Sequence, residues 1–145
     1  SVGGDGATTG YDMMEYVTIS SAGNATDFGN LTQARMQLSA TSNSVNNRGV
    51  VAGGTKDGTK YNIIDYITIN STGNATDFGD LTLARNGLSA LSNGTGERGV
   101  FGSGDPVGAK IRMDYITINS TGNATVFGAM RKDTAQASSA SDCGT

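Results

Sequence analysis

Acidic residues are the side chains of this 145-residue chain whose types and spacing would allow catalysis. The sequence contains no histidine, so the commonest general base and transition-metal ligand is absent. Paired carboxylates remain, and they suit hydrolysis of a glycosidic bond. The candidate pairs are Asp27 with Asp77 and Asp65 with Asp114. Because each pair occupies equivalent positions in an internal repeat, we expect a shared role in turns or at strand edges, and no catalytic pair.

Three further aspartates, Asp5, Asp57 and Asp105, lie in glycine-rich segments where carboxylates would suit calcium. Their spacing matches no recognised calcium loop, so we expect solvated turn residues. The single cysteine, Cys143, cannot form a disulfide within one chain. The sequence therefore predicts neither a metal site nor another cofactor.

An internal repeat organises the whole chain. One short sequence motif recurs around Tyr16, Tyr66 and Tyr115, which are spaced 50 and 49 residues apart. Each copy is followed by a second motif that contains Gly-Asn-Ala-Thr. Self-similarity at this period is the signature of a repeat architecture. We interpret residues 1–145 as a single repeat domain whose units span approximately 1–48, 49–98 and 99–145.

Each unit has the pattern of four short strands. Residues 14–19 and their copies carry β-branched and aromatic residues on both faces, as expected for an interior strand. The turn at 71–74 leads into a second strand through Thr76 and Phe78, which predicts a hairpin. The small residues of 38–42 predict the innermost strand, and residues 48–54 predict a fourth strand that ends in glycines.

Composition and charge narrow the class of protein. The 22 glycines, the single proline and the absence of tryptophan favour an all-β chain with frequent turns. The net charge of −3 arises from small, mixed numbers of acids and bases, so neither nucleic acid nor an anionic membrane is an expected partner. No apolar run approaches the roughly 20 residues that span a bilayer.

The repeat resembles the kelch repeat, in which paired glycines, an aromatic strand, a hairpin and an arginine follow one another. The residues that carry this resemblance are Gly3-Gly4, Tyr16, Phe28 and Arg35, and then Gly53-Gly54, Tyr66, Phe78 and Arg85. The chain departs from kelch where Phe replaces the typical outer-strand Trp. The resemblance implies kelch-like β-propeller blades of four strands. A stacked β-solenoid is the alternative fold.

The amino-acid sequence of the repeat is also similar to repeats in structural or tail-associated proteins of marine tailed phages. This similarity rests on Tyr-Ile-Thr-Ile at 66–69, Gly-Asn-Ala-Thr-Asp-Phe-Gly at 73–79 and Arg-Gly-Val-Phe-Gly at 98–102. It implies a non-catalytic structural or adhesion module of a virion, in a tail fibre, a tail-associated protein or a capsid decoration. Such a module is extracellular and presents loops to other virion proteins or to a host surface glycan. The alternatives are a glycan-depolymerising tailspike enzyme and a kelch scaffold that binds a protein partner.

Three units are too few to close a propeller, which has four to eight blades. The N-terminal end continues the repeat pattern at the point where the C-terminal end stops. A second copy, joined head to tail, would therefore give a six-bladed ring. A longer parent chain would serve equally, and the start at Ser1 rather than Met favours an excised piece.

Two sets of repeated side chains are expected to be structural. We predict that Arg35, Arg85 and Arg131 tie units together through carbonyl or carboxylate bonds. We predict that the tyrosines at 16, 66 and 115 pack in the core rather than form a sugar-stacking face. The asparagines of the Asn-x-Ser/Thr triplets are interpreted as turn residues: Asn70, Asn74, Asn119 and Asn123.

Overall fold

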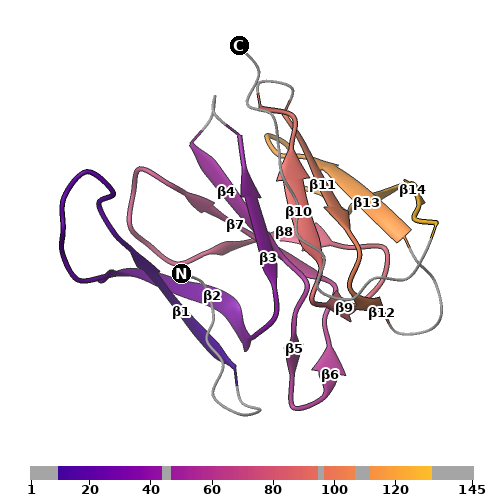
Figure 1. Ribbon diagram of the computed structural model, residues 1–145, viewed down its shortest axis with the longest axis horizontal. Coiled ribbons are helices and arrows are strands. Elements are labelled where there is room, and N and C mark those ends of the chain that lie inside the picture. Colours follow the sequence, from indigo (N-terminus) through magenta and orange to yellow (C-terminus); the bar gives the residue numbers. More distant parts are fainter. Residues whose placement is uncertain (1–9, 44–46, 95–96, 107–111, 132–145) are drawn as a thin grey trace.

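The computed structural model describes residues 10–43, 47–94, 97–106 and 112–131, and this part of the chain is all-β (Figure 1). Within those ranges no helix is long and apolar enough to cross a membrane. The long strands are β1 (Tyr11–Tyr16), β2 (Thr26–Arg35), β3 (Ser39–Ser42), β4 (Arg48–Ala52), β7 (Ile63–Thr68), β8 (Thr76–Asp80), β10 (Ser89–Ser92), β11 (Arg98–Gly102), β13 (Arg112–Thr117) and β14 (Thr125–Ala129). The two-residue strands are β5 (Thr55–Lys56), β6 (Thr59–Lys60), β9 (Arg85–Asn86) and β12 (Asp105–Pro106).

The long strands form three antiparallel sheets. The first sheet is the pair β1-β2, the second has the order β3-β4-β7-β8, and the third has the order β10-β11-β13-β14. No described sheet closes on itself. Four strands per repeat, in the predicted order, are therefore confirmed for the second and third sheets.

The sheets follow one another as a fan in which each packs on the next. The strands of small residues, β3 and β10, contact each other near the centre of Figure 1, as predicted for the innermost strand. Their alanine and serine side chains allow this close approach. Each four-stranded sheet begins at the small-residue strand, so β3 lies in the unit that ends near residue 48, and its three sheet partners follow from Arg48 onward. The sheets are thus offset from the repeat units by one strand.

The aromatic strand begins and ends earlier than the sequence indicates. We expected residues 14–19 and their copies, but β1 spans Tyr11–Tyr16, and β7 and β13 both span the equivalents of residues 13–18. The chain leaves the ladder early because a turn starts there: the Ser71 N–H donates to Thr68 O at 3.1 Å. The Ile69 N–H donates to the Asn47 carbonyl at 2.6 Å instead of to a strand partner.

Apolar side chains fill both gaps between the sheets. Neighbouring residues of β4 point to opposite faces, so Val51 packs in a cluster with Met14 and Phe28 of the first sheet. Val50 packs in a second cluster that includes Phe101 of the third sheet. The middle sheet is therefore buried on both faces, as the β-branched and aromatic residues on both faces of its interior strand predicted.

Candidate functional site

The interface between successive units is the most elaborate polar arrangement in the described chain, and it begins with a buried arginine. Arg85 lies between the second and third sheets, and its Nη2 is 2.9 Å from Asp114 Oδ2 of β13. Both side chains are almost fully buried. Arg85 also donates to the carbonyl oxygens of Arg112 at 2.6 Å and Phe101 at 3.1 Å. The arginine therefore joins its own unit to the next one.

The same arrangement occurs one unit earlier. Arg35 Nη2 lies 2.9 Å from Asp65 Oδ2, with both side chains fully buried, and Arg35 Nε donates to the Gly53 carbonyl at 2.8 Å. The Arg35–Asp65 contact is an ion pair without hydrogen-bond geometry, and the described residues offer that Nη2 no other acceptor. The predicted role of Arg35 and Arg85 in tying units together is confirmed.

Each buried aspartate accepts two further hydrogen bonds from a threonine of the preceding unit. Thr82 donates from Oγ1 to Asp114 Oδ1 at 2.6 Å and from its N–H to Oδ2 at 3.3 Å. Thr32 binds Asp65 in the same way, at 2.6 and 3.2 Å. Hydrogen bonds to a carboxylate are stronger than neutral ones and offset its removal from water. The carboxylates are therefore fully engaged in holding the units together.

Burial and charge act against each other at Arg85. Burial lowers the pKa of the Arg85 guanidinium, and the adjacent Asp114 carboxylate opposes that shift. Arginine nevertheless stays protonated at ordinary pH, so the pair is ionic. An arginine held in this way is a structural cation and does not act as a general acid.

A turn from each unit docks on the outer strand of the unit before it. In the second junction, the Gly122 N–H donates to Phe78 O at 2.8 Å, and the Ala124 N–H donates to Asp80 O at 2.8 Å. The Asp80 N–H donates in return to Asn123 Oδ1 at 3.0 Å. The first junction repeats these three bonds with residues 73–75 on residues 28–30.

The close approach of turn and strand requires glycine in the strand. A Cβ atom at Gly79 would lie 2.5 Å from the Gly122 carbonyl oxygen, and one at Gly29 would lie 2.3 Å from that of Gly73. Gly79 has φ of 140° and Gly29 has φ of 139°, which side chains rarely adopt. The Phe-Gly dipeptide of the repeat is therefore a docking platform for the next turn.

Aromatic and cationic side chains stack on the outer part of each sheet. Each repeat tyrosine meets its phenylalanine edge to face, with ring centroids 6.1 to 6.2 Å apart. The Arg48 guanidinium lies 4.3 Å from the Tyr66 ring centroid, and that of Arg98 lies 4.6 Å from the Tyr115 centroid. Tyr66 packs against a buried core cluster, as predicted. Tyr115 is half-buried, and its ring partner Phe127 is exposed. The prediction of core packing was wrong for Tyr16, because the sheet beside it leaves its ring exposed.

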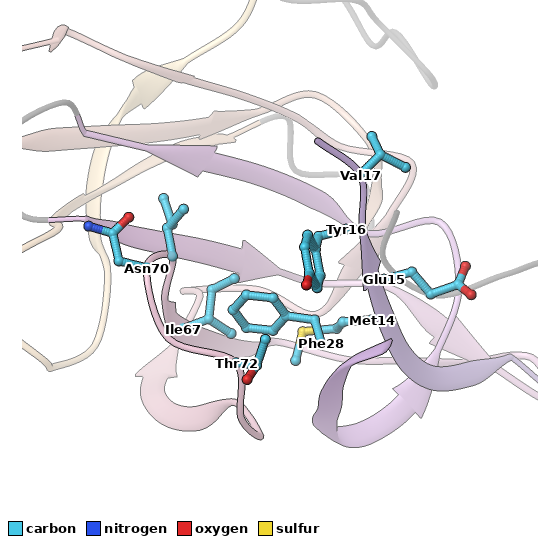
Figure 2. A pocket seen from close by; sticks show the side chains of 9 residues that line it. Met14, Glu15, Tyr16, Val17, Phe28, Ile67, Asn70 and Thr72 are labelled. Carbon is cyan, nitrogen blue, oxygen red and sulfur yellow. The ribbon is translucent and has the colours of Figure 1, made fainter. Parts of the chain in front are cut away.

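The first sheet differs, because a hollow of about 400 Å³ opens beside Tyr16, a side chain that is 43% exposed. Figure 2 shows the rings of Tyr16 and Phe28 facing Ile67, with Thr72 at one edge, while Glu15 points away on the other side of β1. Most of this lining is apolar. The hollow offers an aromatic face next to a hydroxyl and an amide.

The candidate acid pairs do not form catalytic pairs in the described structure. Asp65 and Asp114 lie in different sheets, each within its own ion pair. Our expectation that they occupy turns or strand edges was wrong, because both are fully buried in interior strands. Asp27 and Asp77 are exposed at the start of β2 and β8, one in each sheet.

The structure describes two of the three candidate calcium aspartates. Asp57 sits at the tip of the β5–β6 hairpin with φ of 50°, and Asp105 pairs with Lys60 at 2.7 Å. Asp5 and Cys143 lie outside the described residues. Across the described ranges no group of three or more His, Cys, Asp or Glu side chains could hold a metal.

Arg131 is exposed and falls in a different register from the other two arginines. Ala129 pairs with Arg112 as Asp80 pairs with Ile63, so residue 131 stands where Thr82 stands in the unit before. The third unit has three fewer residues between Phe127 and Arg131 than the second unit has between Phe78 and Arg85, which explains this shift.

Sequence reasoning missed the threonines and the turn asparagines as interface residues. Thr32 and Thr82 recur with the same spacing from the Phe-Gly dipeptide, which was an available signal. Asn74 and Asn123 were interpreted as turn residues, and their side chains in fact bind the preceding strand. Asn119 Oδ1 accepts from Asn43 Nδ2 at 3.0 Å, which adds a further bond between the second and third sheets.

Comparison with known proteins finds no matching family model and no matching curated protein.

Proposed function

We propose that this chain is a non-catalytic structural or adhesion module of a phage virion, built from kelch-type propeller blades. The observation that carries the proposal is the engagement of Asp65 and Asp114 in buried inter-unit ion pairs. The carboxylates that recur most regularly hold sheets together, so they are not presented to a substrate. We place the module in a virion, outside the cell, because its repeat is similar to phage repeats.

The blade interpretation draws support from the meander order of both four-stranded sheets and from the contact between β3 and β10. Four-stranded sheets whose inner strands gather side by side are the construction principle of a propeller. The paired glycines Gly53 and Gly54 both have positive φ where β4 ends, as the kelch comparison implies. A rigid fan of this kind presents turns rather than moving parts.

The hollow beside Tyr16 is the surface we assign to contact with a host surface glycan. An exposed aromatic face favours stacking on a sugar ring, and the nearby Thr72 and Asn70 supply polar groups at the rim. A surface glycan is therefore the proposed partner of this face, and other virion proteins are the proposed partners of the remaining surface.

Binding and turnover assays on the purified protein test this function. We expect retention on a panel of polysaccharides extracted from marine bacteria, with no release of reducing sugar. Tyr16→Ala should lower retention by up to about tenfold, because an aromatic stacking contact contributes about 0.5 to 1.5 kcal/mol. Tyr11→Ala is the matched control, since Tyr11 is an exposed tyrosine of the same strand outside the hollow.

Turnover of any of these polysaccharides, abolished by Asp77→Asn, would overturn the non-catalytic assignment in favour of a depolymerase. Equal loss of retention in the Tyr16→Ala and Tyr11→Ala variants would show that the hollow beside Tyr16 is not the glycan-binding surface.

A further inference from the structure

Each junction between units consists of two complementary surfaces. The turn face comprises the buried aspartate, the two apolar residues that alternate with it and the docking turn, as in Asp65, Ile67, Ile69 and residues 71–75. The strand face comprises the Phe-Gly dipeptide of the outer strand and the threonine three positions after its glycine, as in residues 28–32. The chain joins a turn face to a strand face twice, between the first and second units and between the second and third.

The turn face of the first unit is exposed. Ile19 is 98% exposed, whereas its equivalent Ile69 is 44% exposed beside the two-stranded first sheet, and Ile118 is fully buried beside the complete second sheet. Exposure therefore follows the number of described strands in the preceding sheet. A fully exposed isoleucine at a position built for burial marks an unfilled interface.

The turn of the first unit is already formed. The Ser21 N–H donates to Thr18 O at 3.2 Å, as Ser71 and Ser120 do at 3.1 and 3.0 Å in their own units. Residues 21–25 are all exposed, whereas Ala124, the equivalent of Ala25, is buried. A preformed turn loses little conformational freedom on docking.

The strand face of the third unit is exposed in the same way. Phe127 is 49% exposed, whereas Phe28 and Phe78 are 8% and 3% exposed beneath the turn faces that cover them. An added Cβ at Gly128 would meet only the Met113 side chain, at 3.6 Å, so no described turn occupies this platform.

The charges at the two exposed surfaces are complementary. Glu15 stands at the position of Asp65 and Asp114, and Arg131 stands at the position of Thr32 and Thr82. Within the chain this position joins a carboxylate to a threonine hydroxyl. At the outer surfaces it would join a longer carboxylate to a cation, and both side chains are exposed.

We propose that the turn face of one copy of this chain docks on the strand face of a second copy. Gly23 and Ala25 then donate their N–H groups to the carbonyls of Phe127 and Ala129, and the Ala129 N–H donates to Asn24 Oδ1. Arg131 pairs with Glu15. The contact is heterologous, and two copies that make it twice form a closed ring. The inference rests on the geometry of the junctions and is independent of the virion assignment.

The mass of the wild-type chain in solution, measured by sedimentation equilibrium over a range of concentrations, tests the proposal. We expect an assembly of at least twice the 14.7 kDa of the chain. Glu15→Lys and Arg131→Glu should each raise the dissociation constant about tenfold or more, because each places like charges together. The double variant restores an opposite pair and should associate nearly as well as wild type.

Ala25→Arg adds bulk at the docking turn and should also block association. Thr59→Arg is the matched control, because Thr59 is exposed at the β5–β6 hairpin, away from both faces. Thermal unfolding shows whether each variant is folded. A wild-type chain that stays at the mass of one copy would overturn the proposal, as would single charge reversals that leave association unchanged or a double variant without rescue. Loss of glycan retention with association intact would count against the proposed function alone.

Discussion

Arg85 and Asp114 are bound 2.9 Å apart, Nη2 to Oδ2, although they belong to different units and are 29 residues apart in the chain. The same pairing joins Arg35 to Asp65. Because each aspartate also accepts from a threonine, the polar core of the junction consists of three side chains from two units. Stability in such a repeat is expected to reside largely in nearest-neighbour interfaces.

Gly79→Ala should lower the free energy of unfolding by about 1 to 3 kcal/mol, because the new Cβ would overlap the Gly122 carbonyl and Gly79 has φ of 140°. Gly73→Ala is the control, from the docking turn of the other junction, since nothing lies within 4 Å of an added Cβ there. Urea unfolding compares the two. Equal stability of both variants would show that the turn does not dock as described.

The two stacked arginines should differ in importance. Arg98→Ala removes a stacking contact with Tyr115 and should lower the free energy of unfolding by about 0.5 to 1 kcal/mol. Arg48→Ala removes the equivalent stack and also the bond from Nη1 to the Ile118 carbonyl at 2.9 Å, so a loss of about 2 to 3 kcal/mol is expected. Thermal or urea unfolding measures both values, and a larger loss for Arg98→Ala would contradict the assigned contacts.

Amide hydrogen exchange should follow the sequence of docked turns. The Ala124 N–H bonds to Asp80 O, so we expect protection similar to that of the core strands. Ala25 is exposed at the equivalent position, and its amide should exchange rapidly when the protein is diluted to single chains. Protection of Ala25 that increases with concentration would agree with head-to-tail association. Rapid exchange at Ala124 would contradict docking of the third unit's turn.

The sequence predicts the strands well because their signals are local. Small residues at 39–42 and the glycines after Ala52 determine where strands run and end, and both were found as expected. The arginines also carried a usable signal, because an Arg that recurs just before the small-residue strand of each unit needs a recurring acceptor. The all-β class and the hairpin at residues 71–74 follow from turn chemistry alone.

The role of the aspartates was not predictable in the same way. Asp65 looks like a polar residue at a strand edge when only neighbouring residues are considered. Its burial depends on Arg35 and Thr32, which are 30 and 33 residues away in the chain. The hollow beside Tyr16 likewise depends on which strands stand beside β1, and no local pattern encodes that.

A double-mutant cycle on Arg85 and Asp114 tests the central claim, that buried ion pairs join the units, most directly. Arg85→Met and Asp114→Leu should each lower the free energy of unfolding by about 3 to 5 kcal/mol, because each leaves an unpaired buried charge. The double variant should lose less than the sum, with a coupling of about 2 to 3 kcal/mol. Two single losses that add to within about 0.5 kcal/mol in the double variant would contradict the account.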